Sequence, residues 1–106
     1  MVSQKTLDLI VKRLVKAAKP TKIILFGSHA RGDASEDSDL DLLVIKRAVG
    51  NRGEEMVRLL TVLDGLDVPV DLLVYSESEV KARRNWFSSV VSWALKEGRI
   101  LYETQN

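Results

Sequence analysis

The spacing of hydrophobic residues along the chain predicts its helices and strands. Residues 3–18 carry apolar side chains at helical spacing with basic residues between them, a pattern typical of an amphipathic helix. Ser3 is suited to cap this helix and Pro20 to end it. Shorter runs of Ile, Leu and Val have the length of buried strands. The predicted strands are residues 22–26, 40–45 and 68–75, and the further predicted helices are residues 54–63 and 85–97, a single turn at 28–31 and a short helix from Ser76.

The order of these elements predicts the fold class. Helices and strands alternate, and a short extended tail follows at 99–102. Such an order predicts a small α/β (α+β) fold, with a mixed sheet of about three to four strands and helices packed on it. Neither a linker nor a low-complexity segment interrupts the 106 residues, so we predict one domain over residues 1–106.

Composition narrows the class of protein. Apolar residues make up 45% of the chain, which is enough for a core, but no run is long and apolar enough to cross a membrane. The absence of cysteine excludes disulfides and thiolate metal sites. A net charge of +1, with both signs interspersed, gives no signal for nucleic-acid binding. We predict a cytoplasmic protein, since the amphipathic start does not have the pattern of a signal peptide.

Two carboxylates stand at the front of the second predicted strand. Asp39 and Asp41 are two residues apart, so they project from the same face of that strand. Asp71 begins a second Asp-Leu-Leu-Val run, and adds a third carboxylate if the third strand lies alongside. Converging carboxylates repel one another unless a cation lies among them, and magnesium typically takes one or two carboxylates with phosphate oxygens. The alternative is a strand end that faces water.

A glycine-serine turn precedes these carboxylates. Gly27 ends the first predicted strand and Ser28 begins a helical turn. A helix N-terminus favours phosphate, and glycine lets a phosphate approach the backbone. The alternative is an ordinary connection in which Ser28 caps the helix. Together, the turn and the carboxylates form a phosphate cradle beside a magnesium site, the two parts that nucleotidyl transfer needs.

The spacing of these motifs resembles a known family. Gly27-Ser28, ten residues and then Asp39-Leu40-Asp41 are similar to the Gly-Ser-x10-Asp-x-Asp signature of the DNA polymerase beta-like nucleotidyltransferase superfamily. The run FGSHARGDASEDSDLDLLV resembles its minimal nucleotidyltransferase (MNT) branch. The resemblance implies that Gly27 and Ser28 hold a nucleoside triphosphate and that Asp39, Asp41 and Asp71 are catalytic and bind Mg²⁺. It also implies that Asp71 acts as general base on the acceptor hydroxyl.

Two further residues of the turn have competing interpretations. Arg31 matches the arginine of Gly-Ser-x-x-Arg-Gly, and either binds a phosphate of the nucleotide or forms an internal ion pair. The acidic residues available for such a pair are Asp33, Glu36 and Asp37. His29, the only histidine, is expected at the surface and not in catalysis.

The resemblance implies a function and a partner. MNT proteins are commonly paired with a HEPN ribonuclease toxin in toxin–antitoxin systems. The implied function is magnesium-dependent transfer of AMP from ATP to a tyrosine hydroxyl of a cognate HEPN toxin. Three alternatives remain: an antitoxin that acts by binding alone, a small-molecule nucleotidyltransferase, and a nucleotide-binding regulatory module.

The last predicted helix carries more apolar residues than packing on a sheet requires. The apolar residues there span roughly 200° of the helix circumference, whereas one packed face needs an apolar stripe only somewhat above ~100°. They are Trp86, Phe87, Val90, Val91, Trp93, Ala94 and Leu95. The excess predicts a surface for a homo- or hetero-oligomer. The alternative is that other parts of the chain cover both sides.

Overall fold

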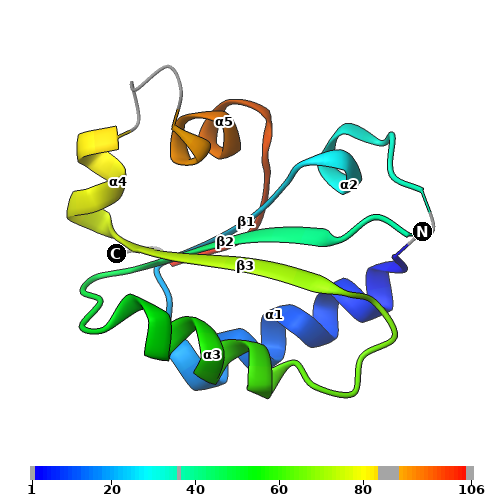
Figure 1. The fold of residues 1–106 in the computed structure, drawn as a ribbon, viewed down its shortest axis with the longest axis horizontal. Helices are drawn as coiled ribbons and strands as arrows, with labels where there is room; N and C mark the ends of the chain where they lie inside the picture. Colours follow the sequence, from blue (N-terminus) through cyan, green and yellow to red (C-terminus); the bar gives the residue numbers. More distant parts are fainter. Residues whose placement is uncertain (1, 36, 84–88, 105–106) are drawn as a thin grey trace.

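The computed structural model describes residues 2–35, 37–83 and 89–104, which form a four-stranded sheet between two layers of helices (Figure 1). The helices are α1 (Gln4–Ala18), α2 (Ser28–Arg31), α3 (Arg52–Val62), α4 (Glu77–Arg83) and α5 (Val90–Glu97). The strands are β1 (Lys22–Phe26), β2 (Leu40–Lys46), β3 (Val70–Ser76) and β4 (Arg99–Glu103). No helix in these ranges has the length and hydropathy needed to span a bilayer.

The sheet has the order β3-β2-β1-β4. β1 runs antiparallel to both β2 and β4, whereas β2 and β3 are parallel and are connected by α3. Helices α1 and α3 lie below the sheet in Figure 1, and α4 and α5 lie above it. The predicted mixed α/β sheet with packed helices is therefore confirmed, and the predicted extended tail is its fourth strand.

Helix α1 has the boundaries that its sequence predicts. The Ser3 hydroxyl accepts a hydrogen bond from the backbone N–H of Thr6 at 3.2 Å, as an N-cap does. The helix ends at Ala18, and its C-cap Lys19 is left-handed with φ of 48°, directly before Pro20. Its apolar stripe is buried against the sheet at Leu7, Ile10, Leu14 and Ala18.

The two faces of the sheet carry cores of different size. Below the sheet, the larger core includes the alternate residues Leu40, Leu42 and Val44 of β2 together with apolar side chains of α1 and α3. Above it, a smaller cluster buries Leu43 and Ile45, along with Ile24 and Ala94. Helix α5 thus covers Leu43 and Ile45, because Ala94 belongs to this helix.

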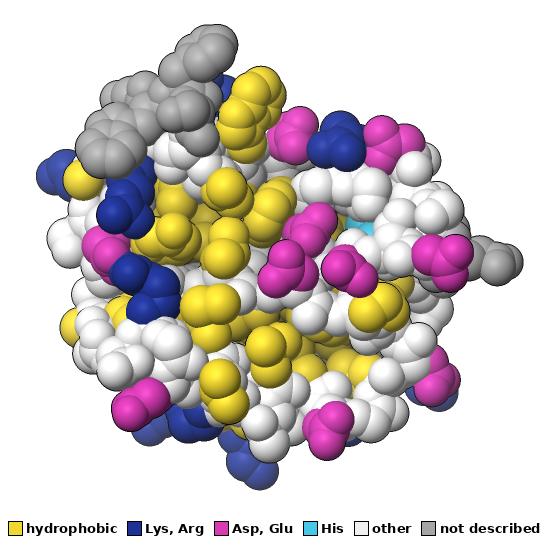
Figure 2. Space-filling view, viewed as in Figure 1, with side chains coloured by type: hydrophobic (Ala, Val, Ile, Leu, Met, Phe, Trp, Pro, Cys, Tyr) yellow, Lys and Arg dark blue, Asp and Glu magenta, His cyan; other side chains and the backbone are white. Residues whose placement is uncertain are grey.

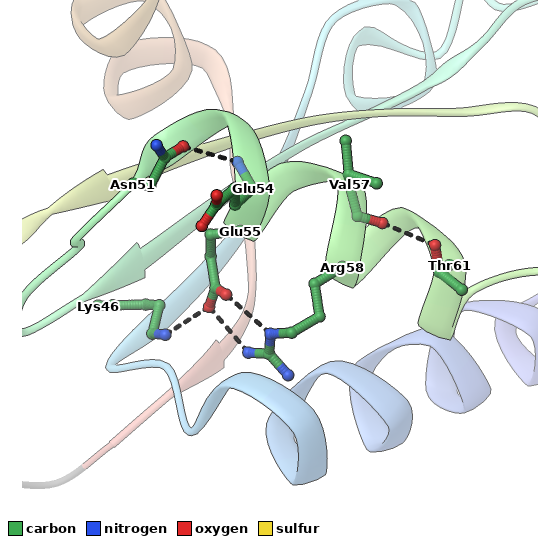
Figure 3. A network of polar contacts seen from close by, with 7 residues as sticks. All are labelled: Lys46, Asn51, Glu54, Glu55, Val57, Arg58 and Thr61. Atoms are coloured by element: carbon green, nitrogen blue, oxygen red, sulfur yellow. Dashed lines mark hydrogen bonds and ion pairs between the residues drawn. The ribbon is translucent and has the colours of Figure 1, made fainter.

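The predicted starts of two helices have different outcomes. Helix α3 starts two residues before the predicted Glu54, because the Asn51 side chain caps it by accepting from the Glu54 N–H at 2.9 Å (Figure 3). The predicted start of the last helix at residue 85 lies outside the described residues. Within them, α5 begins at Val90 with Ser89 as its cap.

Glu55 fastens α3 to the end of β2 (Figure 3). Its carboxylate accepts from Lys46 at 2.5 Å and from Arg58 at 2.8 and 2.9 Å. The Arg58 hydrogen bonds, followed by those of Lys46, outweigh burial and lower the pKa of Glu55 to about 2. The acidic first turn of α3 therefore does more than complement the helix dipole, because it also holds the helix beneath the sheet.

A second polar group holds α4 at the end of β3. Ser76 and Glu79 form a capping box, in which each side chain accepts from the other residue's backbone N–H at 3.2 and 3.0 Å. Arg52 pairs with Glu79, donates to the Val74 carbonyl at 2.9 Å and lies 4.7 Å from the centre of the Tyr75 ring. These contacts cover the end of an edge strand.

Candidate active site

The register of the sheet brings two carboxylates side by side. Asp41 of β2 is in register with Asp71 of β3 on one side and with Phe26 of β1 on the other. The two Asp-Leu-Leu-Val runs thus pair residue by residue, up to Val44 with Val74. Since residues in register project from the same face, both carboxylates lie on the upper face.

Asp39 lies on the same side of the sheet, directly before β2. By strand alternation it projects with Asp41, while Leu40, Leu42 and Val44 enter the lower core. Figure 2 shows acidic side chains gathered at this end of the visible face, beside a patch of hydrophobic side chains. The structure therefore brings together the three carboxylates that the sequence singled out.

The surroundings of Asp41 shift its pKa. Partial burial raises the pKa of Asp41, and the negative charges of Asp71 and Asp39 raise it further. The positive charges of His29 and Arg31 act in the opposite direction. Asp41 is half-buried, whereas Asp39 and Asp71 are exposed. The site therefore concentrates negative charge, and one of its three carboxylates, Asp41, is partly shielded from water.

The carboxylates fit a magnesium ion that arrives with a nucleotide. Among residues 2–35, 37–83 and 89–104, no three His, Cys, Asp or Glu side chains form a ready-made metal cage. Magnesium seldom uses such a cage, since it takes one or two carboxylates and completes its shell with phosphate and water oxygens. An all-oxygen donor set in which Asp41 has two carboxylate neighbours suits this mode of binding.

Gly27 places the turn directly against Asp41. Its backbone has φ of 75° and ψ of −155°, a region that is essentially open only to glycine. A Cβ atom at this position would lie 2.2 Å from Oδ2 of Asp41. The missing side chain thus leaves the space into which the Asp41 carboxylate fits. The sequence predicts a phosphate site at the turn Gly27-Ser28, called the phosphate turn below, and a metal site at the carboxylates. The two are therefore adjacent.

Ser28 is the first residue of α2 and does not cap it. Gly27 occupies the N-cap position and its carbonyl accepts from the N–H groups of Ala30 and Arg31 at 3.1 and 3.0 Å. The alternative interpretation of Ser28 as an N-cap is therefore wrong. Its half-buried side chain stands at the start of a helical turn, as the phosphate interpretation requires.

Arg31 is engaged in two ion pairs. Its guanidinium lies 3.2 Å from Asp33 and 3.1 Å from Glu97. Asp33 was among the predicted partners, and another, Glu36, lies outside the described residues. Glu97 was missed, because no local pattern indicates that the end of α5 lies beside this turn. Binding of a phosphate by Arg31 stays a prediction.

His29 makes a contact that the sequence analysis missed. Its Nε2 atom lies 3.1 Å from the backbone carbonyl oxygen of Ser38, the residue before Asp39. The ring is half-buried, which is more enclosed than the expected surface position. Only the three-dimensional path of the loop that follows α2 brings the two residues together.

Comparisons with known proteins agree on one family. Residues 5–92 match the model of the nucleotidyltransferase domain. A candidate protein adenylyltransferase of Methanocaldococcus jannaschii is 36% identical over 98 residues, which cover 87% of this chain and 94% of the relative.

Solved structures share the fold. A crystal structure of a toxin-antitoxin with AMP-PNP is 27% identical, with a TM-score of 0.63, over 93% of this chain and 74% of that one. A tri-AMPylated HEPN toxin of Shewanella oneidensis in complex with MNT antitoxin gives 25% identity and a TM-score of 0.57, over 96% and 73%. The chain therefore belongs to the nucleotidyltransferase domain family, as its Gly-Ser turn and Asp-x-Asp motif predicted.

Proposed function

We propose that this nucleotidyltransferase transfers AMP from ATP to a protein hydroxyl in a magnesium-dependent reaction. The observation that carries the proposal is the register of Asp41 with Asp71, with the Asp41 carboxylate packed against the bare backbone of Gly27. The names of the relatives support it, because one is given as a candidate protein adenylyltransferase and another structure contains AMP-PNP. ATP as substrate would place the reaction in the cytoplasm.

Each part of the site has a role in this proposal. The backbone at Gly27 and the hydroxyl of Ser28 hold the triphosphate, and Arg31 contributes positive charge nearby. Asp39, Asp41 and Asp71 would hold magnesium, which neutralises phosphate charge when it is bound.

Asp71 is the proposed general base. It takes the proton from the acceptor hydroxyl while that oxygen attacks the α-phosphorus and pyrophosphate leaves. Asp71 suits this role because it is exposed on the edge strand of the sheet, whereas Asp41 is half-buried between two strands.

We further propose that the acceptor is a tyrosine of a HEPN-domain toxin. The AMPylated HEPN toxin bound to an MNT antitoxin supports a HEPN toxin as the acceptor, and the tyrosine is the residue that the family resemblance implies. Helix α5 offers a contact surface, since Val91 and Ala94 are buried while Val90 and Trp93 are 46% and 50% exposed. Ile100 of β4 is also exposed. Trp86 and Phe87, which the sequence analysis included, lie outside the described residues.

The decisive experiment locates the transferred AMP. The protein is incubated with Mg²⁺, ATP labelled at the α-phosphate and a HEPN-domain protein supplied as the acceptor, and mass spectrometry identifies the labelled residue. We expect AMP on a tyrosine, and no transfer by the Asp39→Asn/Asp41→Asn variant. The Asp8→Asn/Asp64→Asn variant is the matched control, because it removes two exposed carboxylates elsewhere on the surface.

Two results would contradict the proposal. If the toxin is neutralised without label although ATP binds, the protein acts by binding alone. If label appears only on small molecules, the acceptor class is wrong.

A further inference from the structure

The three carboxylates of the candidate site are not anchored equally. Asp41 and Asp71 lie within the paired strands β2 and β3, so the hydrogen-bond ladder fixes their positions. Asp39 lies one residue before β2, outside the ladder. The peptide group that follows Asp39 is held by the Leu40 N–H, which donates to the Pro69 carbonyl at 2.8 Å, so the loop determines the position of the peptide group that precedes Asp39.

Ser38 is the residue through which that loop reaches Asp39. Its hydroxyl accepts from the Ser35 N–H at 2.9 Å, and its own N–H donates to the Ser35 carbonyl at 3.1 Å. Its carbonyl oxygen lies 3.1 Å from Nε2 of His29. This carbonyl belongs to the peptide group that joins Ser38 to Asp39, so the contact holds the backbone at the point where Asp39 begins.

His29 belongs to the other half of the site. It follows Ser28 in α2, the turn proposed to hold the triphosphate. It is half-buried. One side chain thus connects the phosphate turn to the residue before the first proposed metal ligand.

We propose that His29 is a positioning residue, which couples the Asp39 carboxylate to the phosphate turn by holding the Ser38 carbonyl. The inference rests on the proposed function, since it assigns His29 to the same magnesium–ATP site. In this role His29 acts through the Ser38 carbonyl and would bind neither the metal nor the phosphate. Its loss weakens the contribution of magnesium to ATP binding and leaves the metal-independent part unchanged.

Calorimetry measures this contribution directly. ATP affinity is determined with Mg²⁺ and with EDTA, and the ratio of the two affinities is the magnesium benefit. His29→Leu puts an apolar side chain of similar size in place of the imidazole, and this side chain donates no hydrogen bond. We expect it to lower the benefit roughly threefold to tenfold, the effect of one lost hydrogen bond, with unchanged affinity in EDTA. His29→Gln, whose amide can donate to the same carbonyl, should restore most of the benefit.

Three outcomes would overturn the inference. An unchanged benefit in His29→Leu would contradict it alone and leave the proposed function intact. Equal losses of ATP affinity with Mg²⁺ and with EDTA would assign His29 to phosphate binding, or to folding where a lower melting temperature accounts for both losses. A parent protein without any magnesium benefit would contradict the metal site of the proposed function, and this inference with it.

Discussion

Two separate constraints favour glycine at position 27 in the candidate site. Its backbone conformation disfavours any side chain, and the space beside it is filled by the Asp41 carboxylate. Gly32, at the other end of α2, shares the positive φ, at 84°, but an added Cβ would meet nothing within 4 Å. Substitutions at the two glycines that flank α2 thus separate two effects. Both would strain the backbone, but only a side chain at Gly27 would displace the Asp41 carboxylate.

Gly27→Ala should therefore affect chemistry as well as stability. We expect a loss of roughly 1–3 kcal/mol in the free energy of unfolding from strain. We also expect a fall in transfer rate of at least about 10²-fold, because Asp41 must move. Gly32→Ala should cost roughly 1–2 kcal/mol and keep most of the activity. Denaturant unfolding and the AMP-transfer assay give the two quantities. Equal activity in the two variants would show that Asp41 does not depend on this space.

Asp71 allows the general-base role to be separated from nucleotide binding. Asp71→Asn keeps the size of the side chain but cannot accept the proton, so transfer should fall by roughly 10²–10⁴-fold. ATP affinity should fall only modestly, because Gly27 and Ser28 would hold the triphosphate. Single-turnover transfer and calorimetry measure the two effects. A rate within a few-fold of the parent would reduce the site to two catalytic carboxylates.

At the scale of elements, the sequence predicts what local patterns determine. Ser3 and Pro20 mark the ends of α1, and alternation places Asp39 and Asp41 on one face. Pairing partners are different, because no local pattern says which strands become neighbours. The adjacency of Asp71 to Asp41 could thus be stated only as a condition, and the Arg31–Glu97 ion pair could not be predicted at all.

The junction between β2 and α3 gives a prediction about pH. Glu55 has its pKa lowered to about 2 from 4.5 by Arg58 and Lys46, so the unfolded chain binds its proton more tightly than the native protein does. Its contribution to stability is therefore complete above pH 4.5, and is lost as the pH falls toward 2. Glu55→Gln should cost roughly 1–2 kcal/mol at pH 7 and almost nothing near pH 2.

Urea unfolding at several pH values tests this expectation. The control is Glu54→Gln, which changes the exposed neighbour of Glu55 in the same helical turn. A difference between parent and Glu55→Gln that does not vary with pH would contradict the ion-pair explanation.

At the scale of the whole molecule, the two helical layers differ in how completely they cover the sheet. The lower layer encloses the larger core, while the upper layer holds a smaller cluster and leaves Leu73 half-buried near the carboxylates and Tyr75 half-buried at the far end of β3. Ion pairing of Arg31 with Glu97 joins the phosphate turn to α5 across this layer. The surface proposed to contact a toxin is thus connected to the site.

Trp93 provides the test of that surface. Trp93→Ser removes a large apolar side chain that is 50% exposed, so it should weaken toxin binding at least about tenfold with little change in melting temperature. Val57→Ser is the control, since Val57 is 65% exposed on α3 in the opposite layer. Titration calorimetry with the HEPN-domain protein measures both. If the two substitutions have the same effect, the toxin binds elsewhere.

The pairing of β4 with β1 has a consequence for synthesis. It joins distant parts of the chain, since Thr104 donates to the Thr21 carbonyl at 2.9 Å although the two are 83 positions apart. On the ribosome, one edge of β1 therefore stays unpaired until β4 emerges. That edge belongs to an Ile- and Leu-rich strand, which can pair with strands of other nascent chains. Chains that stall before β4 should need chaperones or aggregate, although they already contain every carboxylate of the site.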